Sequence, residues 1–158
     1  MSQLTGLKKF NLKSLLPPHS LRRIKNLAFL GAVDEVSFIL CLYFQNIFIF
    51  APRFMGISDS EYFRLQEVYG AASIVCVWPG GWLSDRVENG LLVRISLILS
   101  GIAGIMFSIF SSPVFSFFVS GNYFFFYAPL YVLWGVSTSG LLWASLWKLV
   151  ARQASSKN

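Results

Sequence analysis

Two adjacent carboxylates and one amide stand inside an apolar stretch near the start of the chain. Asp34 and Glu35 lie in the run 27–50, and Gln45 follows three helical turns later. A charge at the centre of a membrane helix costs about 2.5–3.5 kcal/mol, and a carboxylate held there can exchange a proton near neutral pH. Asp34, Glu35 and Gln45 are therefore candidates for binding a small polar solute or coupling a proton. A purely structural role, in which one carboxylate only hydrogen-bonds a neighbouring helix, is equally open.

The same stretch carries a polar stripe at helical spacing. Its members are Asp34, Ser37, Cys41 and Gln45. Residues at these intervals share one helix face, and we expect that face to meet protein or water rather than lipid.

A second polar cluster, Gly81-Trp82-Leu83-Ser84-Asp85-Arg86-Val87, separates two apolar runs. This pattern predicts a turn of at most seven residues on one membrane face. Gly81, one turn before Asp85, is expected to let another helix approach the backbone. Asp85 is expected to face the positive end of a neighbouring helix, where a carboxylate is favoured by about 0.3–1 kcal/mol.

Gly81, Leu83, Asp85 and Arg86 match, position by position, the G-x-L-[SA]-D-R signature between the second and third helices of major facilitator superfamily transporters. The resemblance implies that the glycine packs the second helix against the opposite half. It also implies that the Asp helps to latch the two halves in one alternating-access state. The family usually continues with a glycine and basic residues, whereas this chain continues with Glu88-Asn89-Gly90. The latch is therefore expected to be weaker or differently tuned.

The resemblance covers about residues 27–150. The stretch 69–86, with Leu133-Trp134-Gly135 and Trp143-Ala144, looks similar to a bacterial branch of permeases proposed to carry sugars or small organic anions. Such a transporter has twelve spans in two halves, with the site between the halves. In several sugar–proton symporters of this family a first-helix carboxylate takes the proton, and Asp34 resembles it. With four spans, the chain is expected to be a fragment, a truncated product or a split subunit, and to be inactive alone.

The composition points to lipid rather than water as the solvent. Of the 158 residues, 55% are hydrophobic and 13% charged, and the mean hydropathy is +0.60. A soluble domain has about 45–50% apolar and 25% charged residues. The net charge of +6 could suggest nucleic acid, but the basic residues lie beside the apolar runs, so we expect membrane lipid as the partner and no nucleic acid.

The residue types of common enzyme sites are scarce. His19 has no nucleophile or ligand set near it, and Cys41 and Cys76 both fall inside apolar runs, where they fill helix faces as free thiols. Gly80-Gly81 lacks the downstream Lys of a phosphate loop. We expect no enzymatic activity, no cofactor and no metal.

The apolar runs predict an all-α membrane bundle with four spans, a truncated form of the transporter fold. The spans are expected at 27–50, 67–83, 91–110 and 123–147. A basic cytoplasmic tail (1–26) precedes the membrane region (27–150), and a short tail (151–158) follows it. The loops are expected at 51–66 and 111–122, with Ser58 or Ser60 capping the second helix.

Three of the spans carry stripes of small or polar residues that favour close helix packing. In the second span they are Tyr69, Ser73, Cys76 and Gly80. In the third they are Ser96, Ser100, Gly104 and Ser108. In the fourth they are Tyr127, Tyr131, Gly135, Ser139, Trp143 and Trp147. Pro79 and Pro129 are expected to kink their helices.

Basic residues set the predicted orientation. Only Arg53 and Arg64 of the 13 Lys and Arg residues fall in predicted outer loops. Because basic residues favour the cytoplasmic side, we expect an inner-membrane protein with both termini in the cytoplasm. The other function class compatible with these features is a small four-helix membrane scaffold or regulatory protein, although the motif at residues 81–87 is not needed for that.

Overall fold

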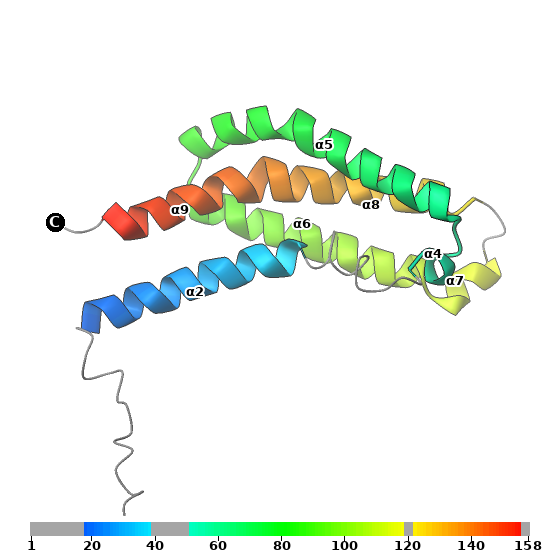
Figure 1. Cartoon of the computed structure of the whole chain (residues 1–158), viewed down its shortest axis with the longest axis horizontal. Helices are drawn as coiled ribbons and strands as arrows, with labels where there is room; N and C mark the ends of the chain where they lie inside the picture. The colour runs from blue at the N-terminus through cyan, green and yellow to red at the C-terminus, as the bar shows by residue number, and fades with distance from the viewer. Residues whose placement is uncertain (1–17, 39–50, 119–121, 156–158) are drawn as a thin grey trace, which may run out of the picture.

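The computed structural model describes residues 18–38, 51–118 and 122–155, and these segments are mainly helical. The helices are α2 (Pro18–Phe38), α4 (Ala51–Met55), α5 (Asp59–Arg86), α6 (Asn89–Phe110), α7 (Pro113–Phe118), α8 (Phe124–Gly135), the π-helix η2 (Val136–Leu142) and α9 (Trp143–Ser155). The last three follow one another without a break and are called the fourth helix below. The all-α prediction is confirmed for the described residues (Figure 1).

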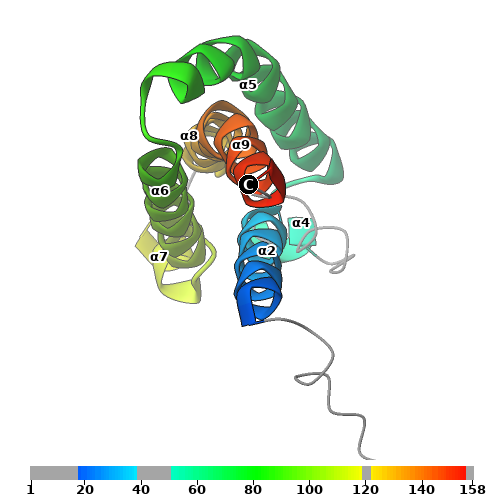
Figure 2. The ribbon, with the colours of Figure 1, turned by 90° about the vertical axis from the view of Figure 1, so that its left-hand side faces the viewer.

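The fourth helix occupies the middle of the bundle. Seen end-on, α5, α6 and α2 lie around it (Figure 2). α5 and α6 pack against α8 and η2, whereas α2 packs against α9 and η2. The fourth helix therefore contacts each of the other long helices and sets their relative positions.

Several helix boundaries differ from the predicted ones. α2 begins at Pro18, so residues 18–26 of the predicted tail are helical, and α5 begins at Asp59 rather than at residue 67. The short helices α4 and α7 occupy parts of the two predicted loops. Hydropathy locates only the apolar part of a helix, whereas the turns that project beyond it are polar. The rest of the predicted first span, with Cys41 and Gln45, lies outside the described residues.

The early start of α5 has a local cause, and the prediction of Ser58 as its cap is confirmed. The Ser58 side chain accepts a hydrogen bond from the Glu61 N–H, and the Glu61 carboxylate accepts one from the Ser58 N–H at 2.9 Å. This reciprocal capping box satisfies two backbone donors that the first turn leaves free. The hydrogen bonds from the Ser58 backbone and hydroxyl lower the pKa of Glu61.

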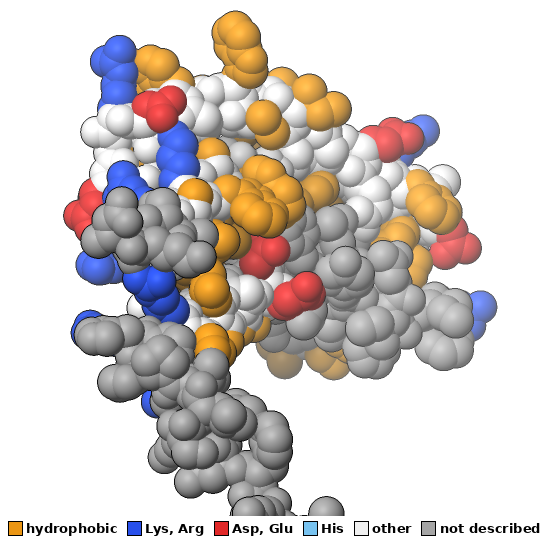
Figure 3. Space-filling view, turned by 60° about the vertical axis from the view of Figure 1, so that its left-hand side comes forward, with side chains coloured by type: hydrophobic (Ala, Val, Ile, Leu, Met, Phe, Trp, Pro, Cys, Tyr) orange, Lys and Arg blue, Asp and Glu red, His pale blue; other side chains and the backbone are white. Residues whose placement is uncertain are grey.

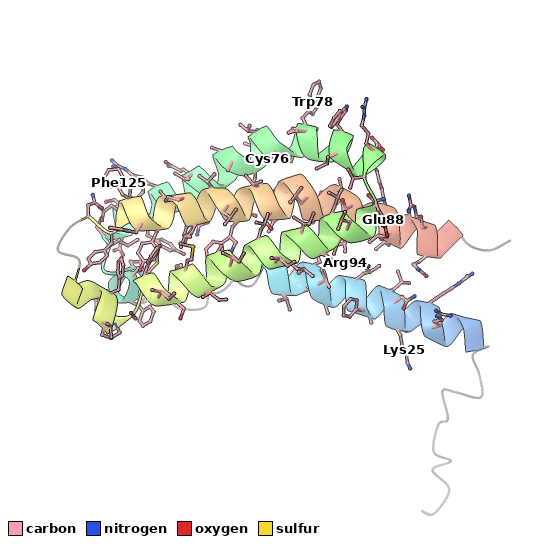
Figure 4. All side chains as sticks on the ribbon, turned by 180° about the vertical axis from the view of Figure 1, so that it is seen from behind. Lys25, Cys76, Trp78, Glu88, Arg94 and Phe125 are labelled. Atoms are coloured by element: carbon pink, nitrogen blue, oxygen red, sulfur yellow. The ribbon has the colours of Figure 1, made fainter. Side chains whose placement is uncertain are left out.

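Two helices of the described part are long and apolar enough to cross a membrane, namely Asn89–Phe110 and Phe124–Gln153. α5 has 28 residues and curves along its length, with Pro79 inside it (Figure 1). Trp78 is 90% exposed and projects away from the bundle (Figure 4). Such large outward apolar side chains form a surface suited to lipid rather than to water.

The larger core cluster lies between α5, α6 and α8. Its buried members include Tyr62, Leu65, Tyr69, Ala103, Tyr127, Leu130, Tyr131 and Trp134. The Phe107 ring lies 5.4 Å from the Tyr127 ring and 5.7 Å from the Trp134 ring, centroid to centroid. A smaller cluster of Val33, Val93 and Leu142 joins α2 and α6 to η2. Aromatic packing thus dominates one end of the bundle and aliphatic packing the other.

The predicted stripe on α6, called the serine seam below, is confirmed for Ser96 and Ser100 only. Ser96 and Ser100 are buried against η2, where their hydroxyls lie 3.0 and 2.8 Å from the Ser137 hydroxyl. Ser108 is exposed, and Ala103 is the next buried position instead. An α-helix turns about 3.6 residues per turn, so a strict four-residue spacing drifts around the helix. The seam therefore leaves the contact face after Ser100.

The buried face of the fourth helix departs from the predicted stripe after Gly135, because the π-helix η2 follows there. Tyr127, Tyr131 and Gly135 are buried as predicted, but the next buried small residue on that face is Gly140 rather than Ser139. A π-helical turn holds an extra residue, so the face moves on by one position. Trp143 and Trp147 are 44% and 55% exposed, and the irregularity lies at residues 136–142 rather than at Pro129.

Ser100→Ala should destabilise the bundle more than Ser108→Ala. The first change removes a buried hydroxyl that bonds Ser137, and interhelical hydrogen bonds in membranes contribute about 0.6–1.7 kcal/mol. The second removes an exposed hydroxyl from the same helix. Unfolding of both variants in detergent measures the difference, and equal stability would contradict the seam.

Candidate functional site

The residues at 81–86 form the last turns of α5 rather than a turn between helices. α5 continues to Arg86 and is capped by Val87, whose N–H donates to the Leu83 carbonyl at 2.9 Å. Only Val87 and Glu88 separate α5 from α6, which begins at Asn89. The predicted short turn is therefore confirmed, but it holds only these two residues. The placement of Asp85 and Arg86 in the turn was wrong, because a helix can carry charged residues in a terminal turn that leaves the apolar layer.

Asp85 pairs with a side chain of the fourth helix. The Lys148 ammonium donates to Asp85 Oδ1 and to the Ser84 hydroxyl, the latter at 2.7 Å. Ser84 is buried and donates in turn to the Gly81 carbonyl at 2.7 Å. Three polar groups thus tie the end of α5 to α9. Asp85 therefore faces a lysine rather than the positive end of a helix.

Lys148 is not among the functional residues predicted from the sequence. Its position gave one usable signal, since the basic-residue rule already placed it on the same membrane face as Asp85. The two side chains are 36% and 72% exposed, and exposed ion pairs contribute about 0–1 kcal/mol. The bridge is therefore a weak contact that can open at little cost in free energy.

The close helix contact is made by Gly80, a member of the predicted stripe of the second span, and not by Gly81 of the motif. A Cβ placed on Gly81 would meet nothing within 4 Å, whereas a Cβ on Gly80 would lie 2.0 Å from the Gly140 carbonyl oxygen. Successive helical residues point about 100° apart, so only one of the two can face the fourth helix. Gly81 does not pack against another described helix, and Gly80 does.

Gly80→Ala should therefore be much more disruptive than Gly81→Ala. The new methyl group at residue 80 overlaps the Gly140 backbone, which cannot move aside as a side chain could. Overpacking of this kind costs about 1–3 kcal/mol. Thermal unfolding of the two variants in detergent tests this, and a Gly81→Ala variant that is equally unstable would contradict the assignment.

The remaining motif residues are Leu83 and Arg86, in the last turn of α5. Leu83 is half-buried, and the Arg86 guanidinium carbon lies 4.3 Å from the centroid of the Trp82 ring. This cation–π contact holds Arg86 on its own helix. Arg86 is thus directed to the α5 surface, while Asp85 reaches α9.

The candidate coupling residues Asp34 and Glu35 belong to α2, which packs against a different face of the fourth helix. Asp34 is half-buried on α2, and its Oδ1 atom is buried with no hydrogen-bond partner in the described segments 18–38, 51–118 and 122–155. Ser37 is buried on the same face and donates to the Val33 carbonyl at 2.9 Å. Glu35 is exposed, and Gln45 lies outside the described residues. The protein-facing stripe is thus confirmed for Asp34 and Ser37, and Glu35 is not part of it.

Asp34 and the motif are not brought together. α2 packs against α9 and η2, whereas the motif lies at the end of α5, with the fourth helix between them (Figure 2). Both regions nevertheless touch α9, through Lys148 on one side and through Leu146 and Trp147 on the other. α9 is the element through which a change at one region could reach the other.

The Asp85–Lys148 bridge should give a small, specific coupling energy. In a double-mutant cycle with Asp85→Asn and Lys148→Met, we expect non-additivity of up to about 1 kcal/mol that decreases with added salt. Arg94→Met, which removes an exposed cation from α6, should be additive with Asp85→Asn. Additivity of both pairs in unfolding measurements would show that the bridge does not form.

Two curated proteins are similar to this chain. A Mycoplasma pneumoniae protein described as an uncharacterized MG294 homolog is 28% identical over 151 residues, which is 95% of this chain and 31% of that protein. The Escherichia coli inner membrane protein YqcE is 29% identical over 89 residues, which is 56% of this chain and 21% of that protein. The chain thus spans less than a third of the length of either relative. No protein-family model and no solved structure matches it.

Proposed function

We propose that the chain forms part of a secondary active transporter of the major facilitator type, with four spans in the inner membrane. The complete protein would move a small polar solute, such as a sugar or organic anion, with proton coupling. The similarity to a protein named an inner membrane protein and the two membrane-length helices support the membrane location. The greater length of both relatives supports further helices that complete the site.

The observation that carries this proposal is the bridge from Asp85 of the motif to Lys148. A transporter that alternates between two states needs contacts at the helix ends that break and re-form. A partly exposed ion pair that contributes about 0–1 kcal/mol meets that need. The close contact of Gly80 with Gly140 keeps α5 and the fourth helix packed when the ion pair opens. The bridge made by Asp85 thus supports a role for this residue in a conformational latch.

The distribution of charge supports cytoplasmic termini. Figure 3 shows most of the described Lys and Arg side chains gathered at one end of the bundle, which includes the start of α2 and the end of α9. Because basic residues concentrate on the cytoplasmic side, we assign this end to the cytoplasm. Asp34 then lies inside the membrane layer, as a proton-coupling residue would.

The test is substrate-dependent proton flux into liposomes that contain a pH-sensitive dye. We expect none from the 158-residue chain alone, and flux with at least one sugar, organic acid or amine when the remaining helices are supplied in trans. Asp34→Asn should abolish that flux, while Glu35→Gln should retain it. Flux from the chain alone, or none from the complete protein, would contradict the proposal. A stable oligomer without flux would instead favour a membrane scaffold.

A further inference from the structure

A cavity of about 190 Å³ lies between α2 and α9, on the side of the fourth helix away from the motif. Its walls are formed by Leu27, Leu30, Gly31, Asp34, Leu146, Trp147 and Val150. One carboxylate is thus set among aliphatic side chains, one indole ring and a glycine. Gly31 leaves part of the space open, because a Cβ placed there would meet nothing within 4 Å.

The carboxylate in this cavity is incompletely satisfied. Asp34 Oδ1 is buried and has no hydrogen-bond partner among the residues that the structure describes. The other lining residues provide no basic side chain, and the nearby Lys148 is engaged by Asp85 and Ser84. A buried acceptor without a donor is unfavourable, so the cavity offers a place for a ligand that brings its own donor and a positive charge.

We propose that this cavity binds a small organic cation, with its ammonium group at Asp34 and its apolar part against Trp147 and the leucines. A carboxylate and an aromatic face are the two groups that recognise an ammonium ion most directly. The aliphatic walls suit an apolar body of matching size. An organic anion would place a second negative charge beside Asp34, so this cavity excludes it, and an anion carried by the complete protein would have to bind elsewhere.

The volume limits the ligand to a small one. Pockets for drug-sized molecules hold about 300–1,000 Å³, which is more than this cavity offers. A monoamine with a single ring or a short alkyl chain suits it better than a disaccharide does. A proton and an ammonium group would compete for the same oxygen of Asp34. As a statement about the transported substrate, this inference rests on the proposed function, whereas binding itself does not.

Three probes with the same ring and different charge test the site, namely benzylammonium, benzyl alcohol and benzoate. Calorimetric titration of the purified chain in detergent, with empty micelles as the blank, should show saturable binding of benzylammonium. Benzyl alcohol should bind about tenfold more weakly or worse, because it lacks the charge-assisted hydrogen bond, and benzoate should not bind. Equal affinity for benzylammonium and benzyl alcohol would overturn the proposal.

Two matched pairs of variants locate the binding. Asp34→Asn should weaken benzylammonium binding by about tenfold or more, while Glu35→Gln, which neutralises the exposed neighbour, should change it less than twofold by the same reasoning. Gly31→Leu should block binding by filling the cavity. Gly101→Leu, at a glycine whose Cβ would also meet nothing within 4 Å, should leave it intact.

Benzylammonium affinity that is unchanged in both Asp34→Asn and Gly31→Leu would place binding elsewhere and reject this cavity. The liposome flux assay and the binding assay in detergent test different claims. Absence of flux from the complete protein counts against the proposed function alone, whereas failure of benzylammonium to bind in detergent counts against the cation site alone.

Discussion

The backbones of α5 and the fourth helix approach so closely that glycine is required at two positions, Gly80 and Gly135. A Cβ at Gly80 would lie 2.0 Å from the Gly140 carbonyl oxygen, and one at Gly135 would lie 2.8 Å from the Ala72 Cβ. Without a hydrophobic driving force inside a bilayer, association depends on such close packing and on hydrogen bonds between helices. This contact sets the register of α5 against the fourth helix, with Ser84 beside Lys148 and Cys76 beside Gly140.

The register determines what the polar groups can do. It brings Asp85 to Lys148 at the end of the bundle, and it turns the opposite face of the fourth helix toward α2 and Asp34. The π-helix immediately precedes α9 in the fourth helix, and its Ser137 bonds the two serines of α6. Single π-turns inside helices are frequent at functional sites. α9 thus joins a weak ionic contact on one side to a carboxylate on the other, and the described part of the chain offers that carboxylate's buried oxygen no donor.

The sequence predicted the helices well because apolar runs and small-residue stripes are local signals. Ser58, the α5 stripe and the pair Ser96 and Ser100 fell where expected. The predictions from sequence were wrong where a shift of one residue changes which side chain faces the neighbouring helix. The motif assigned the close approach to Gly81, although the helical stripe had correctly included Gly80, and Ser139 was expected where Gly140 lies, because periodicity alone shows neither the contact phase nor an extra π-helical residue. The Asp85–Lys148 bridge joins residues 63 apart in the chain, and no local pattern predicts such a pairing.

The register can be measured by cross-linking in native membranes. In a Cys41→Ser background, Gly140→Cys places an ideal Cβ 3.2 Å from the Cys76 Cβ, near the range of about 3.5–4.5 Å found in disulfides. Mild oxidation followed by mass-tagging of free thiols should show that both cysteines are lost in Gly140→Cys, whereas Ser139→Cys keeps both. Two free thiols in oxidised Gly140→Cys, or cross-linking in Ser139→Cys instead, would contradict the packing of α5 on the π-helix.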